Sequence, residues 1–391
     1  MTKPLSQSAS DGLAHPLWHP LRQAIYYAAL FYLFLLGIHT VGEGFQLLSR
    51  EIVDRFFEAT SNPFIGLMIG IIATSIIQSS SVTTSLVVGL VAAPEHPLPL
   101  AQAIPIVMGA NFGTTVTNTV VALAHIGKKE EFHRAFAVST CDDFFNFFAV
   151  LIILPIELVT GLLAKTATFL TASLAEVTAT GFRSPIEPVL HFGFAPLNEI
   201  AKALSNSRQI QGSFLILLSG SLVFFALIHL VKALRQSAKT RVHTLITRAL
   251  KQPALISMAL GFGATALVQS SSITTSLLVP LAGAGFISLH QAFPIVLGAN
   301  LGTTMTALLA ALAGTGENAS AGLAIALIHC LFNATGIAAI YPWKRIRTIP
   351  LWCSEKLADT GIRSAPTAIA YVLILFYGIP ALFAILHQIR G

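Results

Sequence analysis

The stretch that decides the fold is VQSSSITTS, residues 268–276. Seven of its nine residues are polar, yet the sequence around it is apolar, with ALISMALGFGATAL before it and LLVPLAGAGF after it. A similar stretch, IQSSSVTTS, occupies residues 77–85. Ser, Thr and Gly in apolar helices commonly mediate close helix packing. Packing does not require Gln followed by three serines twice in one chain, so the doubled motif indicates a binding function.

The composition is that of a polytopic membrane protein. Of the 391 residues, 54% are hydrophobic and 10% are charged, whereas a soluble domain carries about 25% charged residues. Apolar runs long enough to span a bilayer, about 20 residues, recur along the chain. The net charge of +6 does not indicate nucleic-acid binding, because Lys and Arg cluster in short loops. The three cysteines lack the close spacing of a disulfide framework or metal site, so we expect no cofactor.

Two halves of the chain carry the same three features in the same order. In the first match, thirteen of twenty-one positions are identical. The matching segments are 70–90 with 261–281, PIVMGANFGTTVT (105–117) with PIVLGANLGTTMT (294–306), and DFFN (143–146) with CLFN (330–333). The two halves are therefore interpreted as products of duplication.

Loop charges predict that the two halves have opposite orientations. Residues 232–251 hold six Lys or Arg, whereas the loop at 50–62 holds two beside three acids. After the second match, the first half has three basic residues within 125–134, while 313–320 has none. By the positive-inside rule, equivalent loops then lie on opposite sides of the membrane. Inverted-topology repeats of this kind are typical of secondary transporters.

We therefore expect an all-α polytopic membrane protein with two inverted-topology repeats, each containing a re-entrant helical hairpin with a QSSS tip and a broken transmembrane helix. The expected hairpins are 63–92 and 253–286, and the expected broken helices are 99–125 and 289–313. The expected divisions are a cytoplasmic N-terminal segment (1–22), repeat 1 (23–175), an external connecting segment (176–210), repeat 2 (211–345), and a cytoplasmic loop with a last transmembrane helix (346–391). Whether 155–175 crosses the membrane is left open, and with it the side of the C-terminus.

The polar runs are expected to form hairpin tips near the middle of the membrane. The apolar stretches beside them, of about 12–15 residues, are too short to span a hydrocarbon core of about 30 Å. Serine is a good N-cap, and a helix N-terminus binds anions through free N–H groups and its dipole. Neither polar block contains Lys or Arg. The predicted anion site consists of Gln78, Ser79, Ser80, Ser81, Gln269, Ser270, Ser271 and Ser272.

The GAN-x-GTT blocks predict cation ligands. Gly109, Gly113, Gly298 and Gly302 are expected to break a membrane helix where irregular backbone lines a cavity. The freed carbonyls, with the Asn and Thr side chains beside them, are oxygen ligands that suit Na⁺ better than a transition metal.

Asp143 lies beside a long apolar run and three residues before Asn146. An acid inside the membrane is a functional hypothesis by default. Its counterpart in the second half is Cys330, so we expect the fixed negative charge in one half only. Asp142 is interpreted as an interfacial residue and His329 as a polar packing residue. The predicted sodium-binding residues are Asp143, Asn146, Asn111, Thr114, Thr115, Asn300, Thr303, Thr304 and Asn333.

These motifs resemble those of the type II sodium-dependent phosphate cotransporters and their bacterial relatives. The resemblance rests on QSSS at 78–81 and 269–272 and on the GAN-x-GTT blocks, and it extends over most of both halves. It implies inorganic phosphate at the tips and more than one Na⁺ per turnover. AVSTCDDFFN (137–146) resembles a family segment that ends in His-Asp-Phe-Phe-Asn, which implies sodium coordination by Asp143 and Asn146. Asp142 stands where that segment has His.

Residue pattern and resemblance together predict a multi-pass protein of the plasma membrane (a bacterial inner membrane). We expect a secondary active transporter that couples inward Na⁺ movement to uptake of inorganic phosphate by alternating access around a midplane site. The expected partners are phosphate, sodium ions and the lipid bilayer, without nucleic acid, and the oligomeric state is left open. A Na⁺-coupled dicarboxylate transporter of similar architecture and an anion channel remain alternatives. No nucleophile–base pair or metal-ligand cluster occurs at workable spacing, so an enzyme is not expected.

Overall fold

The computed structural model describes residues 18–178, 187–250, 252–314 and 318–390, and this part of the chain is helical with short connections. Before residue 179 the helices are α1 (Trp18–Gln46), α2 (Arg50–Ser61), α3 (Pro63–Ile77), α4 (Ser80–Val91), α5 (Leu100–Gly113), α6 (Val116–Leu123), α7 (Lys129–Thr160) and α8 (Leu162–Thr178). After residue 186 they are α9 (Glu187–Leu204), α10 (Arg208–Ala249), α11 (Ala254–Val268), α12 (Ser271–Gly283), α13 (Leu289–Ala311), α14 (Ala319–Ile340), α15 (Lys344–Arg363), α16 (Ala365–Leu373), the π-helical turn η1 (Ile374–Gly378) and α17 (Ile379–Arg390). Most of the predicted N-terminal segment and part of the predicted connecting segment lie outside the described residues.

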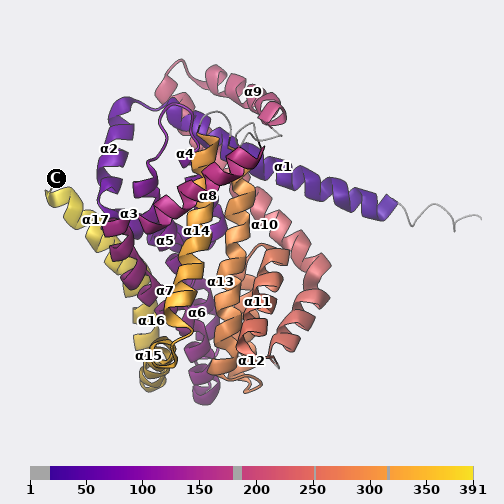
Figure 1. Ribbon diagram of the computed structural model, residues 1–391, viewed down its shortest axis with the longest axis vertical. Helices are drawn as coiled ribbons and strands as arrows, with labels where there is room; N and C mark the ends of the chain where they lie inside the picture. Colours follow the sequence, from indigo (N-terminus) through magenta and orange to yellow (C-terminus); the bar gives the residue numbers. More distant parts are fainter. Residues whose placement is uncertain (1–17, 179–186, 251, 315–317, 391) are drawn as a thin grey trace, which may run out of the picture.

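The helices confirm a multi-pass membrane protein. Among the described residues, seven spans are long and apolar enough to cross a bilayer: Arg22–Gln46, Leu100–Leu123, Lys129–Thr160, Arg208–Leu234, Leu289–Ala311, Ala319–Ile340 and Ala365–Leu386. The pair Ile52–Ser61 and Pro63–Ile77 is bent by 105°. In Figure 1, α9 lies at one end of the molecule and α15 at the opposite end. The repeat boundaries and the re-entrant path through a membrane stay predictions.

The region left open as a further crossing contains α8, which is not among these seven spans. Its start is fixed by Glu157, whose carboxylate is 7% exposed. The backbone N–H of Leu163 donates to Glu157 Oε2 at 2.6 Å, and that of Ala164 donates to Oε1 at 3.2 Å. An acid at a helix N-terminus satisfies free N–H groups and complements the helix dipole. Glu157 therefore acts as the cap of α8.

Two helix pairs correspond to the predicted hairpins. α3 and α4 contain 15 and 12 residues, and α11 and α12 contain 15 and 13. At 1.5 Å per residue, even 15 residues reach only about 22 Å, less than a hydrocarbon core of about 30 Å. Each pair turns at the predicted Gln-Ser dipeptide, 78–79 or 269–270.

The predicted break in the second GAN-x-GTT block is wrong. α13 is one uninterrupted helix of 23 residues through Gly298 and Gly302. In the first half α5 and α6 are separated only at Thr114 and Thr115, both of which keep right-handed helical backbone angles.

The glycines serve close packing instead. A Cβ on Gly109 would lie 2.0 Å from the carbonyl oxygen of Leu67, and one on Gly298 would lie 2.0 Å from that of Met258. Equivalent glycines thus bring α5 against α3 and α13 against α11 in the two halves. Small residues allow such backbone contact in membrane helices.

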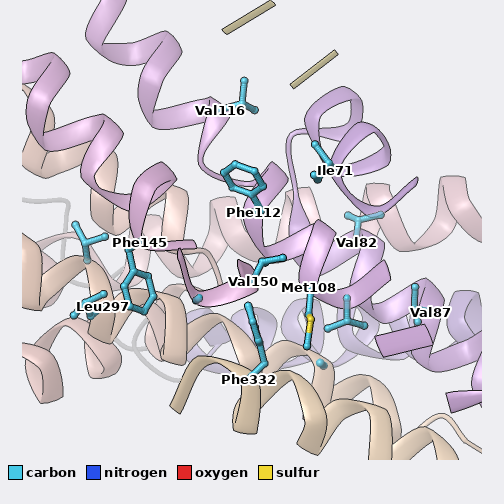
Figure 2. Close-up of a cluster of buried hydrophobic side chains, with 14 of the residues drawn as sticks. Ile71, Val82, Val87, Met108, Phe112, Val116, Phe145, Val150, Leu297 and Phe332 are labelled. Atoms are coloured by element: carbon cyan, nitrogen blue, oxygen red, sulfur yellow. The ribbon is translucent and has the colours of Figure 1, made fainter. Parts of the chain in front are cut away.

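Apolar side chains from several helices surround these contacts. Figure 2 shows part of this core, with residues from α3, α4, α5, α7, α13 and α14. Phe145 and Phe332, which precede the two equivalent asparagines at 146 and 333, are each 1% exposed. Aromatic burial next to a polar residue fixes the direction in which that residue points. The core therefore holds the polar residues of both halves in place.

Adding a methyl group at Gly298 tests this packing. Gly298→Ala is expected to lower the stability of the protein by about 1–3 kcal/mol or more, because the backbones of α11 and α13 must separate. The matched control is Gly263→Ala on α11, where a Cβ would meet nothing within 4 Å. Thermal unfolding of both variants in the same detergent measures the difference, and equal melting temperatures would contradict this account.

Candidate functional site

The two hairpin tips have the same backbone geometry. Gln78 ends α3 with φ 60° and ψ 26°, and Gln269 ends α11 with φ 56° and ψ 28°. They are the two non-glycine residues with positive φ in the described part of the chain. Their backbone N–H groups donate to Thr74 and Thr265, each at 2.7 Å. A left-handed residue other than Gly or Asn is uncommon and points to a specific constraint at that position.

The glutamine side chains show what this constraint is. The Gln78 amide donates to the carbonyl of Ser75, and the Gln269 amide donates to that of Ala266, each at 2.6 Å. The amide oxygen of each glutamine accepts a hydrogen bond from a threonine hydroxyl. Thr117 donates to Gln78 Oε1 at 2.8 Å, and Thr306 donates to Gln269 Oε1 at 2.9 Å.

Thr117 and Thr306 occupy equivalent positions after the GAN-x-GTT blocks. Each tip is therefore fastened to a membrane span of its own half, Leu100–Leu123 or Leu289–Ala311, by the same pair of residue types. The sequence analysis missed these threonines, although both lie in the matched segments.

The two tips touch each other. The Ser81 hydroxyl on α4 lies 3.3 Å from the carbonyl oxygen of Gln269 and 3.4 Å from the hydroxyl of Thr306. A second contact joins α12 to α6, where Thr275 donates to Asn118 Oδ1 at 2.7 Å. The structure thus brings together the two polar runs that the sequence places 191 positions apart.

The helices that leave the tips start with the predicted serines. Ser79 and Ser270 have extended backbone, with φ of −153° and −154°. Ser79 Oγ accepts the N–H of Val82 at 3.4 Å, whereas Ser270 makes no side-chain cap bond. The N-terminus of α4, at Ser81, therefore lies beside the Gln269–Ser270 turn from which α12 starts. Free N–H groups, positive dipole ends and hydroxyls are groups that can hold an anion without a cationic side chain.

The predicted sodium ligands separate into three groups: the asparagines, Asp143, and the threonines of the two blocks. Four asparagines, one from each of α5, α7, α13 and α14, form a buried cluster together with Asp142 and His329. Asn111 donates to Asn146 Oδ1 and, at 3.3 Å, to Asn333 Oδ1. Asn300 donates to Asp142 Oδ1 at 2.6 Å, and Asn146 donates to the same oxygen at 2.8 Å.

This asparagine cluster overturns the interfacial interpretation of Asp142. The side chain is 3% exposed and accepts from both Asn146 and Asn300. Sequence alone missed it because adjacent acids at the edge of an apolar run are normally solvated. His329, the equivalent residue in the other half, is fully buried and its Nε2 lies 3.2 Å from Asn111 Oδ1. His329 is therefore a buried polar residue, as expected, but its contact with Asn111 was not expected from the sequence.

Asp143 lies in a different setting. Its carboxylate is fully buried, and Oδ2 accepts from Thr119 at 3.2 Å and from Tyr371 at 2.9 Å. Thr115 lies against the same carboxylate. The other oxygen, Oδ1, has no hydrogen-bond partner within the described structure. A buried carboxylate oxygen without a partner is costly unless a cation or proton occupies the position beside it.

The remaining predicted ligands are the threonines of the two blocks. Their hydroxyls donate to carbonyls of their own helices: Thr114 to Ala110, Thr115 to Phe112, Thr303 to Ala299 and Thr304 to Leu301. The oxygen of each hydroxyl keeps lone pairs for another partner. Thr119 and Tyr371 were missed, because neither lies in a matched segment and Tyr371 is 228 positions from Asp143.

Comparison with known proteins shows what the chain is similar to. The sequence profile of the Na⁺/Pi-cotransporter family matches residues 33–168 and 222–351, together more than half of the chain. The human sodium-dependent phosphate transport protein 2B is 31% identical over 89% of this chain and 63% of its own length. The rat protein 2A is 33% identical over 90% of this chain and 65% of its own length. The chain thus spans less than two thirds of these relatives, and no solved structure matches it.

The glutamine–threonine pairs allow an internally matched test. In one pair both residues are buried: Thr306 is 1% and Gln269 is 9% exposed. In the other pair, Gln78, which Thr117 bonds, is exposed. Thr306→Val leaves the Gln269 oxygen buried without a donor, which is expected to cost about 1–3 kcal/mol. Thr117→Val is expected to cost less, because water reaches Gln78. Thermal unfolding of the two variants provides the comparison; an equal or larger loss for Thr117→Val would refute this account of the tips.

Proposed function

Since the chain belongs to the Na⁺/Pi-cotransporter family, we propose that it couples inward movement of Na⁺ to uptake of inorganic phosphate across the plasma membrane. The family is one of transporters rather than enzymes. The observation that carries the proposal is the contact between two equivalent hairpin tips, through Ser81 and Gln269. The relatives named above are sodium-dependent phosphate transport proteins, which supports the same substrates here.

Phosphate would bind at the touching tips. Ser79, Ser80 and Ser81 come from one tip and Ser270, Ser271 and Ser272 from the other. Serine hydroxyls and helix N-termini donate hydrogen bonds, and phosphate oxygens accept them. Without a Lys or Arg in either polar block, phosphate keeps its negative charge in a region of low dielectric. Binding then requires cations nearby, which is the physical basis of coupling to Na⁺.

Sodium would bind beside the unpartnered oxygen of Asp143. Oxygen atoms of Thr115, Thr119 and Tyr371 surround that carboxylate. The described residues contain no group of three or more His, Cys, Asp or Glu suited to a metal ion, and oxygen ligands with one carboxylate suit a monovalent cation. The asparagine cluster, with Asp142, supplies further amide and carboxylate oxygens. Na⁺ is transported in this proposal and is not a resident cofactor.

Each tip would serve both ions. The N-termini of α4 and α12 favour the anion, while the C-terminal ends of α3 and α11, at Gln78 and Gln269, present carbonyl oxygens to cations. Binding of one ion then raises the affinity for the other by the same factor in both directions. We attribute alternating access to the two halves moving as inverted repeats around this site. The unequal exposure of Gln78 and Gln269 supports it, because a site with access from one side exposes equivalent residues unequally.

Uptake of radiolabelled phosphate into proteoliposomes tests the function. Saturable uptake is expected with an inward Na⁺ gradient and not with K⁺ or choline. Ser271→Ala is expected to reduce uptake about tenfold or more, because a hydrogen bond to a charged ligand is lost. Asp143→Ala is expected to weaken the dependence on Na⁺.

The matched control is Ser221→Ala on α10, whose exposed hydroxyl bonds its own helix at Leu217. It is expected to transport normally. Uptake indifferent to Na⁺ would favour an anion channel. Stronger competition by a dicarboxylate such as succinate than by phosphate would favour a dicarboxylate transporter. Either result would overturn the proposal.

A further inference from the structure

Helix α15 joins two membrane crossings along one surface of the protein. It begins at Lys344, just after the span Ala319–Ile340, and ends at Arg363, just before the span Ala365–Leu386. It is not itself among the helices apolar enough to span a membrane. In Figure 1 it lies at the end of the molecule opposite α9.

One face of α15 is fixed to the start of α7. Leu351, Ser354 and Ala358 are buried, and a Cβ on Gly361 would lie 3.1 Å from the ring of Phe132. The neighbouring His133 contacts Asp359, with Nε2 3.0 Å from Oδ1. This contact and a bond from Lys356 hold the pKa of the Asp359 carboxyl below its ordinary value, so Asp359 is ionised and its charge is matched. The orientation of α15 is therefore set by packing, and its other face has no partner within the described structure.

The outward part of α15 carries large apolar side chains at every third position. They are Trp343 at the N-cap (63% exposed), Ile346 (38%), Ile349 (44%) and Trp352 (58%). Four such residues in a row are unfavourable in water. The exposed apolar surface continues onto the next span at Ile369 and Leu373. Tryptophan at the end of a span is typical of the boundary between lipid and water.

The same outward part is basic. Basic residues outnumber acidic ones on this face of α15. The exposed basic side chains are Lys344, Arg345, Lys356 and Arg363; the acids are Glu355 and Asp359, and Asp359 accepts from Lys356. At the same end of the molecule, exposed Lys128 and Lys129 stand at the start of α7, where Lys128 bonds Glu131 at 2.9 Å. An excess of Lys and Arg marks the cytoplasmic side, where the leaflet carries anionic lipids. Apolar anchors beside basic residues are the pattern of a helix that lies in the membrane interface.

We propose that α15 lies in the cytoplasmic interface of the bilayer and binds the headgroups of anionic phospholipids through Lys344 and Arg345, with Trp343 and Trp352 inserted among the acyl chains. This surface is separate from the phosphate and sodium sites, so the inference does not depend on the proposed transport. Its charge matches an anionic leaflet, and its apolar row is continuous with the surface that the adjoining span presents to lipid.

Tryptophan fluorescence tests the proposal directly. The chain contains three tryptophans, and replacing Trp18 by Phe leaves only Trp343 and Trp352 as reporters. The Trp18→Phe protein is reconstituted into phosphatidylcholine nanodiscs that contain a minor fraction of brominated lipid, which quenches tryptophan on contact. At equal mole fraction, brominated phosphatidylglycerol is expected to quench about twofold more than brominated phosphatidylcholine, because basic residues enrich anionic headgroups around them. The preference is expected to fall with added salt.

Charge-removing variants identify the residues responsible. In the Trp18→Phe background, Lys344→Gln with Arg345→Gln is expected to abolish the preference and leave quenching by phosphatidylcholine unchanged. Each single variant is expected to reduce the preference, which keeps the test available if the double variant fails to reconstitute. Lys202→Gln on α9, exposed at the opposite end of the molecule, is the matched control and is expected to keep it.

Four outcomes would overturn the proposal. Equal quenching by the two lipids would show that the headgroup is not recognised. A preference that survives the double variant would assign it to other residues. Loss of the preference on adding inorganic phosphate would mean that Lys344 and Arg345 bind free anions. Absence of quenching by either lipid would mean that protein, such as a second copy of the chain, covers this face.

Discussion

The rest of the structure depends on one repeated interaction, the hydrogen bonds of Gln78 and Gln269 across a left-handed turn. Such a turn costs about 1 kcal/mol or more for a residue with a side chain. Gln269 is also buried, where an unsatisfied amide is expensive. Each glutamine offsets these costs by bonding a carbonyl in its own half-helix and a hydroxyl of Thr117 or Thr306. The same bonds tie each tip to the span that carries Asn111 or Asn300. The position of the serines is thereby coupled to that of the asparagine cluster.

The two halves share this framework and differ in charge. Asp142 and His329 occupy equivalent positions. Asp142 accepts a hydrogen bond from the amide of Asn300, whereas the Nε2 of His329 lies against the amide oxygen of Asn111, the equivalent asparagine. Asp143 likewise has Cys330 as its counterpart. Both carboxylates of the site therefore belong to the first half. In the proposed transport cycle, the first half therefore supplies both negative charges for cations, while both halves contribute serines to the anion site.

The sequence predicted the parts of the site that local pattern determines. The QSSS segments form turns between short helices, and the matched segments supply the residues that meet, because duplication preserves both the motif and its partners. The GAN-x-GTT glycines were misinterpreted because a glycine that breaks a helix and one that admits a neighbouring backbone look alike in sequence; α13 is continuous. Burial of Asp142 and the contact of Tyr371 with Asp143 depend on packing between distant segments. Neither can be predicted from the spacing of residues along the chain.

The central claim is that phosphate and sodium meet where the two tips touch. The most direct measurement is an experimental structure of the protein in a lipid nanodisc with Na⁺ and phosphate, compared with one in K⁺ without phosphate. The account predicts a tetrahedral anion within hydrogen-bond distance of the serine hydroxyls of both tips, and a cation beside the Asp143 oxygen that lacks a partner, both present only in the first condition. Unchanged, unoccupied tips with bound phosphate elsewhere in the protein would contradict it.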